Sequence, residues 1–374
     1  MMDTLYKHSR LPGIDMDLTA AMQKSLHAWY DENKRDLPWR QTRDPYAIWI
    51  SEAMLQQTQV KTVIPYYRRF LDQFPNAACL AAAERQSVYK IWEGLGYYSR
   101  ARHLHQAAGI ITTQMNGCLP HDPKTLQSLP GIGPYIAAAV LSIAFNQPFA
   151  VVDGNVKRVL ARLFLLETPA NGTSHTDFQI LADLLLFNTD PGRHNQAVME
   201  LGALICTPRN PRCLQCPLAL YCNASRQNLT AQYPRRLKRP SLPHQHWVAG
   251  VVLKNDRILL TRRPANGLLG GLWEFPCITI SPNEDPALAC FDAIHNTVGL
   301  KTDHPLHITT IHHTYTHFKL RMDLYLCQFL QGRIRLKGPD AFKWIHPSHT
   351  NKLPLHKAVL KSLPALEKTL CHQK

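Results

Sequence analysis

The sequence predicts two domains of different class, an all-α domain followed by an α+β domain. From about Asp17 to Leu220, apolar residues recur every three to four positions between Pro and Gly, a pattern typical of short helices. Beyond about His246, two β-rich runs flank Asn255-Asp256, which is a hairpin signature. At 374 residues the chain is long enough for two cores. Further strands are expected at 308–310, 317–326 and 334–336, and helices near 286–298 and 354–370.

The charge balance favours a polyanionic partner. The net charge is +15 and the pI is near 9.4, and lysines and arginines that neutralise phosphates release condensed counterions. The N-terminal segment lacks the apolar core of a signal peptide, and no run approaches the roughly 20 apolar residues of a membrane span. We therefore expect no membrane association, and a place in the cytoplasm or, in a eukaryote, the nucleus.

One predicted helix carries a carboxylate on its apolar side. Asp44 and Pro45 are a cap and a first-turn proline, and a helix that begins there puts Glu52 on the same stripe as Ile48 and Leu55. Desolvation on such a stripe raises the pKa of a carboxyl group, which then holds a proton near neutrality. The alternative is an ordinary surface or salt-bridged glutamate.

A glycine hairpin precedes another predicted helix. Gly131 and Gly133 allow positive φ and close approach, and they leave backbone N–H groups free where Pro134 begins a helix. Such groups hold phosphate without reading the base sequence. A single aspartate, Asp153, follows 18 residues after Tyr135. The segment therefore indicates a site that combines a phosphate grip with a carboxylate.

Four of the ten cysteines fall within seventeen residues, in the pattern Cys-x6-Cys-x2-Cys-x5-Cys. A single CxxC with longer gaps on both sides favours one [4Fe–4S] cluster over zinc, although thiolates bind both metals. The predicted ligands are Cys206, Cys213, Cys216 and Cys222.

These motifs together resemble the helix-hairpin-helix DNA glycosylases of the endonuclease III superfamily, and most closely the MutY-type adenine DNA glycosylases. The resemblance covers about residues 20–370. It implies that Glu52 protonates the leaving adenine and that Asp153 stabilises an oxocarbenium-like sugar, with Asn155 beside it. Bifunctional relatives carry a lysine at Tyr135, and a phenol cannot form a Schiff base. We therefore expect hydrolysis without efficient strand scission, while Lys157 leaves a weak lyase side reaction open.

The resemblance also implies how DNA is held. The target base must be flipped out of the stack and the gap must be filled. Tyr97 matches a family position that enters the base stack, and the alternative is that its side chain packs in an ordinary protein core. The positions that match DNA-contacting residues of the family are Arg40, Gln57, Leu95, Tyr97, Gly131, Gly133, Lys157 and Gln196.

Residues 247–276, WVAGVVLKNDRILLTRRPANGLLGGLWEFP, resemble the start of a Nudix-like fold. A working Nudix hydrolase needs a glutamate-rich helix that binds magnesium, and here Ala293, Asn296 and Thr297 stand at the acidic positions. We expect no nucleotide hydrolysis, and the resemblance implies that the domain reads 8-oxoguanine. The stretch that matches the family's lesion-reading turn is Tyr315, Thr316 and His317.

The sequence thus predicts a monomeric glycosylase for adenine paired with 8-oxoguanine or G in duplex DNA. The predicted domains are 17–222, with the cluster loop 206–222, and 247–370. The basic segment 223–246 between them is interpreted either as a solvated tether or as a segment that lies along DNA. The rival functions are a bifunctional glycosylase/lyase, a thymine mismatch glycosylase and a non-enzymatic iron–sulfur DNA sensor.

Overall fold

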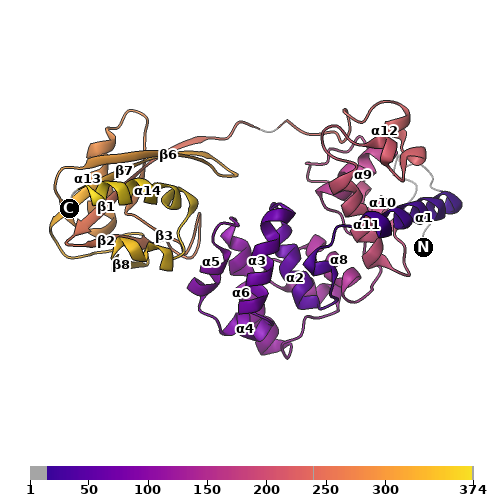
Figure 1. The fold of residues 1–374 in the computed structure, drawn as a ribbon, viewed down its shortest axis with the longest axis horizontal. Helices are drawn as coiled ribbons and strands as arrows, with labels where there is room; N and C mark the ends of the chain where they lie inside the picture. The colour runs from indigo at the N-terminus through magenta and orange to yellow at the C-terminus, as the bar shows by residue number, and fades with distance from the viewer. Residues whose placement is uncertain (1–14, 239, 373–374) are drawn as a thin grey trace. The chain divides into compact units, whose positions relative to one another are not determined.

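The computed structural model describes residues 15–238 and 240–372 (Figure 1). The chain divides into two compact units, of which unit 1 comprises Met1–Ala82 and Gln106–Arg239. Unit 2 comprises Ala83–His105 and Pro240–Lys374. The segment 83–105 therefore packs with the C-terminal part of the chain. The sequence pattern does not predict this association. In the part of the chain that the structure describes, no helix has both the length and the apolarity that a membrane span requires.

Unit 1 is built from helices and holds no strand among its described residues. Helix α6 (Tyr98–Gln114) starts in unit 2 and ends in unit 1. The other elements of unit 1 are α1 (Met16–Asn33), η1 (Pro38–Arg40), α2 (Pro45–Leu55), α3 (Val60–Gln73), α4 (Ala77–Ala82), α7 (Pro123–Ser128), α8 (Pro134–Ile143), α9 (Gly154–Phe164), α10 (Thr176–Leu185), α11 (Pro191–Leu204), η2 (Cys213–Gln215), η3 (Ala219–Tyr221) and α12 (Asn223–Arg226).

Aspartates begin several of these helices. The carboxylates of Asp44, Asp122, Asp153 and Asp190 each accept a hydrogen bond from a backbone N–H of the first turn of α2, α7, α9 or α11. In three of these four helices the first residue is proline, whose ring fixes φ near the helical value. Proline has no backbone N–H, so none is left without a partner at that position. Local chemistry therefore fixes where α9 starts, and with it the position of Asp153.

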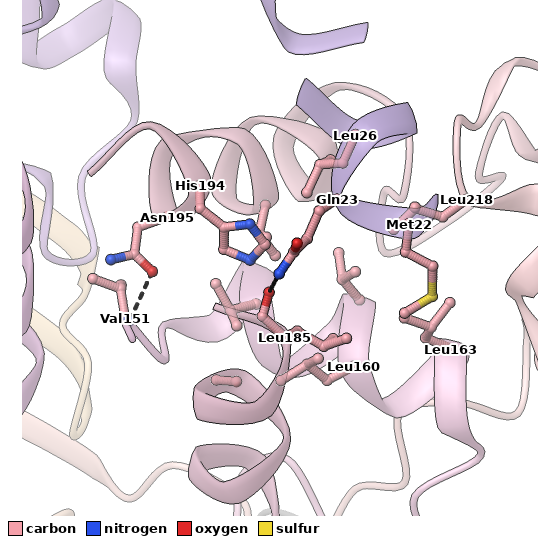
Figure 2. A pocket seen from close by; sticks show the side chains of 14 residues that line it. Met22, Gln23, Leu26, Val151, Leu160, Leu163, Leu185, His194, Asn195 and Leu218 are labelled. Carbon is pink, nitrogen blue, oxygen red and sulfur yellow. Dashed lines mark hydrogen bonds between the residues drawn. The ribbon is translucent and has the colours of Figure 1, made fainter. Parts of the chain in front are cut away.

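Helices α1, α9, α10 and α11 share one apolar core. That core encloses a cavity of about 30 Å³, shown in Figure 2, whose walls include Met22, Leu26 and Leu160. The volume suits about one water molecule, and the walls are mostly aliphatic. Two hydrogen bonds at its edge pair polar groups of the wall with each other (Figure 2). Gln23 donates to the Leu185 carbonyl, and the Val151 N–H donates to the side chain of Asn195. The cavity is a packing defect of the core and is too small for a base.

Unit 2 is a mixed sheet between helices. Strand β1 pairs in parallel with β7 and antiparallel with β2 and β4, and β6 extends the sheet beyond β7. Its elements are α5 (Arg85–Trp92), β1 (His244–Lys254), β2 (Arg257–Arg262), β3 (Trp273–Glu274), β4 (Cys277–Ile280), α13 (Pro286–Val298), β5 (Lys301–Thr302), β6 (Leu306–Thr314), β7 (Lys319–Gln331), β8 (Ala341–Ile345), η4 (Pro347–Lys352) and α14 (Lys357–Cys371).

The alternation of side chains along β1 separates two apolar clusters. Val248 and Val252 belong to the cluster that contains α13, whereas Trp247 and Val251 belong to the cluster that contains α14. The two helices therefore cover opposite faces of the sheet, because successive side chains of a strand point to opposite sides.

The predicted hairpin at Asn255-Asp256 is confirmed, since Lys254 pairs with Arg257 across it. The predicted helices near 286–298 and 354–370 are confirmed as α13 and α14. The predicted strand at 334–336 is wrong. There the backbone of Arg335 bonds to the Val298 carbonyl, and the neighbouring apolar side chains pack against the α13 side as a loop.

Candidate active site and cluster loop

Glu52 lies on α2, which is buried along nearly its whole length. All residues from Tyr46 to Met54 are buried, and Glu52 is 4% exposed. The helix is therefore not the one-sided apolar stripe that the sequence predicts, because neighbours cover it on every side. Burial raises the pKa of Glu52 to about 7, although a hydrogen bond from Tyr135 lowers it in part. The predicted desolvated carboxyl group is confirmed, and the alternative of a surface glutamate is wrong.

Tyr135 meets Glu52 from the helix that follows the glycine hairpin. The Tyr135 hydroxyl donates to Glu52 Oε2 at 2.5 Å. Burial raises the pKa of Tyr135 well above its usual value of 10, so the phenol stays neutral. Of the two hairpin glycines, Gly131 has a φ of +79°, whereas Gly133 has a φ of −84° and open space where a Cβ would stand. Only the first glycine is required by backbone conformation, and the second leaves room for a close approach.

The start of α8 is open for an anion. Gly133 is its N-cap residue, and among the described residues no side chain caps it. The first backbone N–H groups of a helix have no partner inside the helix, and the helix dipole adds positive charge there. The hairpin therefore offers the phosphate-binding groups that the sequence predicts.

Asp153 caps α9 with one oxygen and is held by a side chain with the other. Its Oδ1 accepts from the Val156 N–H at 2.7 Å, and its Oδ2 accepts from Asn155 Nδ2 at 2.9 Å. Burial raises the pKa of Asp153, and these hydrogen bonds oppose that rise. The charge of Asp153 also raises the pKa of Glu52. The two carboxyl groups are therefore electrostatically coupled: burial raises the pKa of both, and the hydrogen bonds that each accepts oppose the rise.

Arg158 connects Asn155 to the cysteine loop. It donates to Asn155 Oδ1 at 2.8 Å, to the Gly202 carbonyl at 2.7 Å and to the Cys206 carbonyl at 2.7 Å. The residue lies one helical turn beyond Gly154 and is buried. Sequence reasoning missed it because a charged residue inside an apolar helix pattern is usually assigned to the surface.

The four cysteines line one cavity of about 20 Å³ together with Arg162, Ser225, Thr230 and three apolar residues. None of the described residues that line it is a carboxylate. Arg162 donates to Cys206 Sγ at 3.4 Å and to the Thr207 carbonyl at 2.7 Å, which fixes the loop on α9. Burial raises the pKa of the Cys216 thiol to about 12, so cluster binding must displace protons. Four sulfur donors in a space that no described carboxylate lines fit an iron–sulfur cluster.

A second buried carboxylate lies on α11. Glu200 accepts hydrogen bonds from Arg35 Nη2 at 2.6 Å and from Arg40 Nη2 at 2.8 Å. Burial alone would raise the pKa of Glu200, but these hydrogen bonds outweigh it and lower the pKa to about 2. The positive charge of Arg40 also lowers the pKa of Glu52, so Arg40 stands near both carboxylates. Sequence reasoning singled out Arg40 but missed Glu200 and Arg35.

Two further predicted residues of unit 1 are engaged by the protein itself. Gln196 accepts a hydrogen bond from the Tyr30 hydroxyl at 2.9 Å and lines a polar pocket of about 420 Å³ that Arg40 also lines. Lys157 is buried, and its Nζ lies 2.5 Å from His175 Nδ1. Burial lowers the pKa of Lys157, although the charge of Asp153 opposes this. In contrast, Gln57 follows α2 as an exposed residue with a φ of +58°.

The predicted lesion-reading turn joins β6 to β7 in unit 2. Tyr315 does not point outward, since its ring stacks on Phe318 at 4.9 Å and its hydroxyl lies 3.4 Å from His356 Nδ1. Thr316 and His317 are exposed. Of the three residues that match the lesion-reading turn, Tyr315 is therefore an anchor of the turn, and Thr316 and His317 are the two that face solvent.

A buried ionic group supports this anchor. Glu274 accepts from Arg263 Nη1 at 2.8 Å, and its Oε2 lies 3.2 Å from Nε2 of the fully buried His356. The turn also borders a pocket of about 470 Å³ that Tyr97 and Arg102 help to line. Tyr97 has a φ of +49°, and its hydroxyl lies 2.6 Å from Thr316 Oγ1. Leu95, predicted as a wedge, is 5% exposed.

Helix α13 stands where a Nudix hydrolase carries its magnesium-binding glutamates. Its sequence, PALACFDAIHNTV, contains no glutamate, and Ala293 and Thr297 are buried. Glu284 precedes the helix in a turn. The helix therefore lacks the cluster of oxygen ligands that magnesium around a pyrophosphate needs.

Three protein families match separate parts of the chain. Residues 50–181 match the HhH-GPD superfamily of base excision DNA repair proteins, and residues 248–365 match a NUDIX domain. Residues 206–222 match the iron-sulfur binding domain of endonuclease III, which contains all four cysteines. The loop therefore holds a [4Fe–4S] cluster, and the predicted fold class of a helix-hairpin-helix glycosylase domain with a Nudix-like domain is confirmed.

Curated relatives match most of the chain. The chain is 37% identical over 369 residues to the adenine DNA glycosylase of Homo sapiens, which covers 83% of this chain and 67% of that protein. It is 36% identical over 388 residues to the adenine DNA glycosylase of Mus musculus, with 88% and 75% covered. The adenine DNA glycosylase of Buchnera aphidicola subsp. Schizaphis graminum is 30% identical over 339 residues, with 90% and 95% covered.

Solved structures resemble the helical part. A thermostable thymine-DNA glycosylase has a TM-score of 0.51 and 28% identity, and the match covers 56% of this chain and 97% of that chain. An endonuclease III trapped in a covalent intermediate with DNA has a TM-score of 0.51 and 20% identity, with 58% and 100% covered. The second likeness shows the fold alone.

Proposed function

The chain belongs to the adenine DNA glycosylases of base excision repair, and we propose that it removes adenine paired with 8-oxoguanine, or with G, in duplex DNA. It is a hydrolase that acts on DNA. The observation that carries the mechanism is the meeting of Glu52, Tyr135 and Asp153, in which one carboxyl group has a pKa near neutrality beside a second carboxyl group.

Glu52 acts as the general acid. Adenine leaves poorly as an anion, so its departure needs a proton, and a carboxyl group with a pKa of about 7 carries one at neutral pH. The Tyr135 hydroxyl holds the Glu52 side chain through the 2.5 Å hydrogen bond. A carboxyl group with an ordinary pKa would be almost fully ionised at pH 7 and would have no proton to give.

Asp153 stabilises the cationic sugar. Its two oxygens are held by the Val156 N–H and by Asn155, so the carboxylate needs no reorganisation when positive charge develops on the sugar. Water then completes the hydrolysis, and Glu52, having given up its proton, accepts one from that water. The two carboxyl groups thus divide the reaction between the base and the sugar.

The reaction stops at base removal. A Schiff base with the sugar needs an amine, and the position that carries lysine in bifunctional relatives is Tyr135. Lys157, the amine nearest in sequence to Asp153, is buried against His175. This arrangement supports hydrolysis and leaves Lys157 only a minor role in any strand scission.

DNA is held by the hairpin of unit 1 and by exposed residues of each unit. The open start of α8 at Gly131 and Gly133 binds phosphate, and Gln57 enters the stack beside the flipped base. Thr316 and His317 read the opposite base, since Tyr315 is turned inward. The [4Fe–4S] cluster supplies a rigid mount for the basic loop that contains Arg209 and Arg212. One chain carries all of these parts, so we propose that the protein acts as a monomer. We place it with the DNA, in the cytoplasm or, in a eukaryote, in the nucleus.

A panel of duplexes tests this function. The protein is incubated with A opposite 8-oxoguanine, A opposite G and T opposite G, and strand scission is compared with and without hot alkali. The expected result is alkali-dependent cleavage of the adenine strand, fastest opposite 8-oxoguanine. Direct scission without alkali would instead indicate a lyase, thymine release would indicate a mismatch glycosylase, and intact strands would indicate a DNA-binding sensor.

A further inference from the structure

Residues 230–237, here called the strap, are fixed to unit 1 although their composition resembles a flexible linker. Arg162 is 2% exposed, and its Nε donates to the carbonyls of Thr230 at 3.1 Å and Tyr233 at 3.0 Å. Since Arg162 also holds the cysteine loop, the strap and the loop share one buried anchor on α9. The strap is therefore part of the folded glycosylase unit.

A second set of hydrogen bonds fixes the end of the strap. The Ala170 N–H donates to the Arg235 carbonyl at 3.0 Å, and Asn171 bonds both the N–H and the carbonyl of Leu237, at 2.8 and 2.9 Å. Arg235 Nε donates to Glu167 Oε2 at 2.9 Å. Residues 235 and 237 thus turn their backbone polar groups toward unit 1, on both sides of residue 236.

Two basic residues at the end of the strap, Arg236 and Lys238, have side chains that face solvent. Both are exposed, and in the described part of the chain no carboxylate lies within ion-pair distance of either. Burial lowers the pKa of Arg158, and the positive charge of Arg236 lowers it further. Arg236 is therefore close to the first turns of α9, the helix that Asp153 caps.

Two exposed cations beside a fixed stretch of backbone, of which Arg236 lies close to α9, fit a phosphate backbone. Lysine and arginine bind phosphate without reading base sequence, and each contact releases condensed counterions. A side chain that is already fixed by its backbone loses less conformational freedom on binding than one on a free tether. No acidic partner competes for these two charges within the described residues.

We propose that Arg236 and Lys238 contact the phosphate backbone of duplex DNA beside the target nucleotide, and that the strap holds them in place relative to Asp153. The inference rests on duplex DNA as the substrate and depends neither on 8-oxoguanine nor on the roles of Glu52 and Asp153. Of the two interpretations of the basic segment 223–246, it favours the one that lies along DNA, at residues 236–238.

Salt dependence of DNA affinity tests the contact. Arg236→Ala, Lys238→Ala and the double variant are compared with the unchanged protein on a fully paired duplex, which is not cleaved, so the result is independent of the excision chemistry. Each lost phosphate contact is expected to reduce the slope of log K against log salt by about 1, and the double variant by about 2. Lys24→Ala, an exposed lysine on α1, removes the same charge and should leave the slope unchanged. A double variant with the slope of the unchanged protein, or a Lys24→Ala variant with the same loss, would overturn the proposal.

The holding role of the strap needs a variant that keeps both charges. Asn171→Ala removes the two hydrogen bonds to Leu237 and leaves Arg236 and Lys238 in the chain. We expect affinity to fall several-fold, because the strap end must then be ordered on binding. Unchanged affinity would show that the strap holds nothing in place. Visible absorbance of the cluster and thermal unfolding verify that each variant is folded.

Discussion

Unit 1 buries two glutamates in opposite environments. Glu52 on α2 is 4% exposed and faces a neutral phenol, and its pKa rises to about 7. Glu200 on α11 is 1% exposed and faces two guanidinium groups, and its pKa falls to about 2. Two side chains with little exposed surface thus have very different pKa values, because at Glu200 the hydrogen bonds from Arg35 and Arg40 outweigh the effect of burial.

The contrast separates a chemical group from a structural one. A buried carboxylate that receives two charge-assisted hydrogen bonds is ionised at every pH near neutrality and can neither give nor take a proton. A buried carboxyl group with one phenol partner keeps its proton available. We therefore assign proton transfer to Glu52 and the fixing of Arg35 and Arg40 to Glu200. The predictions below alter these partners.

Glu52→Gln should have the largest effect. The amide keeps the shape of the side chain and has no acidic proton, so single-turnover excision of adenine should fall about 100- to 10,000-fold, the usual range for loss of a general acid. Duplex affinity should stay close to that of the unchanged protein, because Glu52 is buried.

Glu32→Gln, an exposed glutamate on α1, is the matched control and should be fully active. Excision by Glu52→Gln within a few-fold of normal would remove Glu52 from the chemistry, and a large loss of duplex affinity would instead indicate a structural role.

Glu200→Gln should be the most destabilising of these changes. It leaves Arg35 and Arg40 without a counter-charge in a largely buried place, and the removal of one partner from such a group costs about 3 kcal/mol. The pKa of Glu200 is lower in the folded state than in the unfolded state. Its stabilising contribution is therefore present above the ordinary value of 4.5 and is lost as pH falls toward about 2.

Denaturant unfolding at several pH values measures both effects. The Glu200→Gln variant should be less stable at pH 7 and should lose less stability than the unchanged protein as the pH falls below 4.5. Glu167→Gln, whose partner Arg235 is solvent-exposed, should unfold like the unchanged protein. Equal stability of the Glu200 and Glu167 variants would refute the structural assignment of Glu200.

The same contrast shows what a sequence can reveal. Glu52 was predicted because a cap, a proline and a motif are local, and local chemistry does begin α2 at Pro45. Glu200 was missed because its partners lie 160 and 165 residues away in the chain, so that no spacing marks the ion pairs. Likewise, the predicted helices α13 and α14 have clear patterns, whereas the 334–336 segment is apolar because it packs against α13 and not because it forms a strand.

The sequence likewise does not reveal that the strap is held against unit 1, because the residues that hold it are far away in the chain. Its composition is polar, basic and proline-bearing, which is typical of a tether. What holds it is Arg162 on α9 and Asn171 after it, and each bonds backbone groups that carry no sequence signal. Side-chain chemistry can be predicted from residue types, but backbone partners far along the chain cannot.

Tyr135→Phe should change the pH dependence of excision. The Tyr135 hydroxyl lowers the pKa of Glu52, so its removal should raise that pKa above about 7. Glu52 acts in its protonated form, and the rate falls as pH rises through its pKa. In a plot of excision rate against pH, the fall in rate on the alkaline side, the alkaline limb, should therefore move to higher pH by on the order of one unit. A hydrogen bond to a charged group is worth roughly 1.5 kcal/mol, which corresponds to about one pKa unit.

A single-turnover pH profile on the adenine duplex gives the measurement. An alkaline limb that stays in place, or moves to lower pH, would show that the phenol does not control the protonation of Glu52. A uniform drop in rate without any displacement would place Tyr135 in positioning alone.

Tyr315→Phe should have the smallest effect and extends the comparison to unit 2. Glu274, like Glu200, is held by an arginine, because Arg263 donates to both of its oxygens at 2.8 Å. The His356 ring lies between Glu274 and Tyr315, with Nε2 3.2 Å from Glu274 Oε2 and Nδ1 3.4 Å from the Tyr315 hydroxyl. Phenylalanine keeps the ring stacked on Phe318 and loses only the hydroxyl contact, so folding should be unchanged. If that contact fixes the turn that presents Thr316, the preference for 8-oxoguanine over G opposite adenine should fall a few-fold, while the excision rate on the A:G duplex stays constant. A loss of rate on both duplexes would instead mean that the turn serves general DNA binding, and an unchanged preference would mean that ring stacking alone holds the turn.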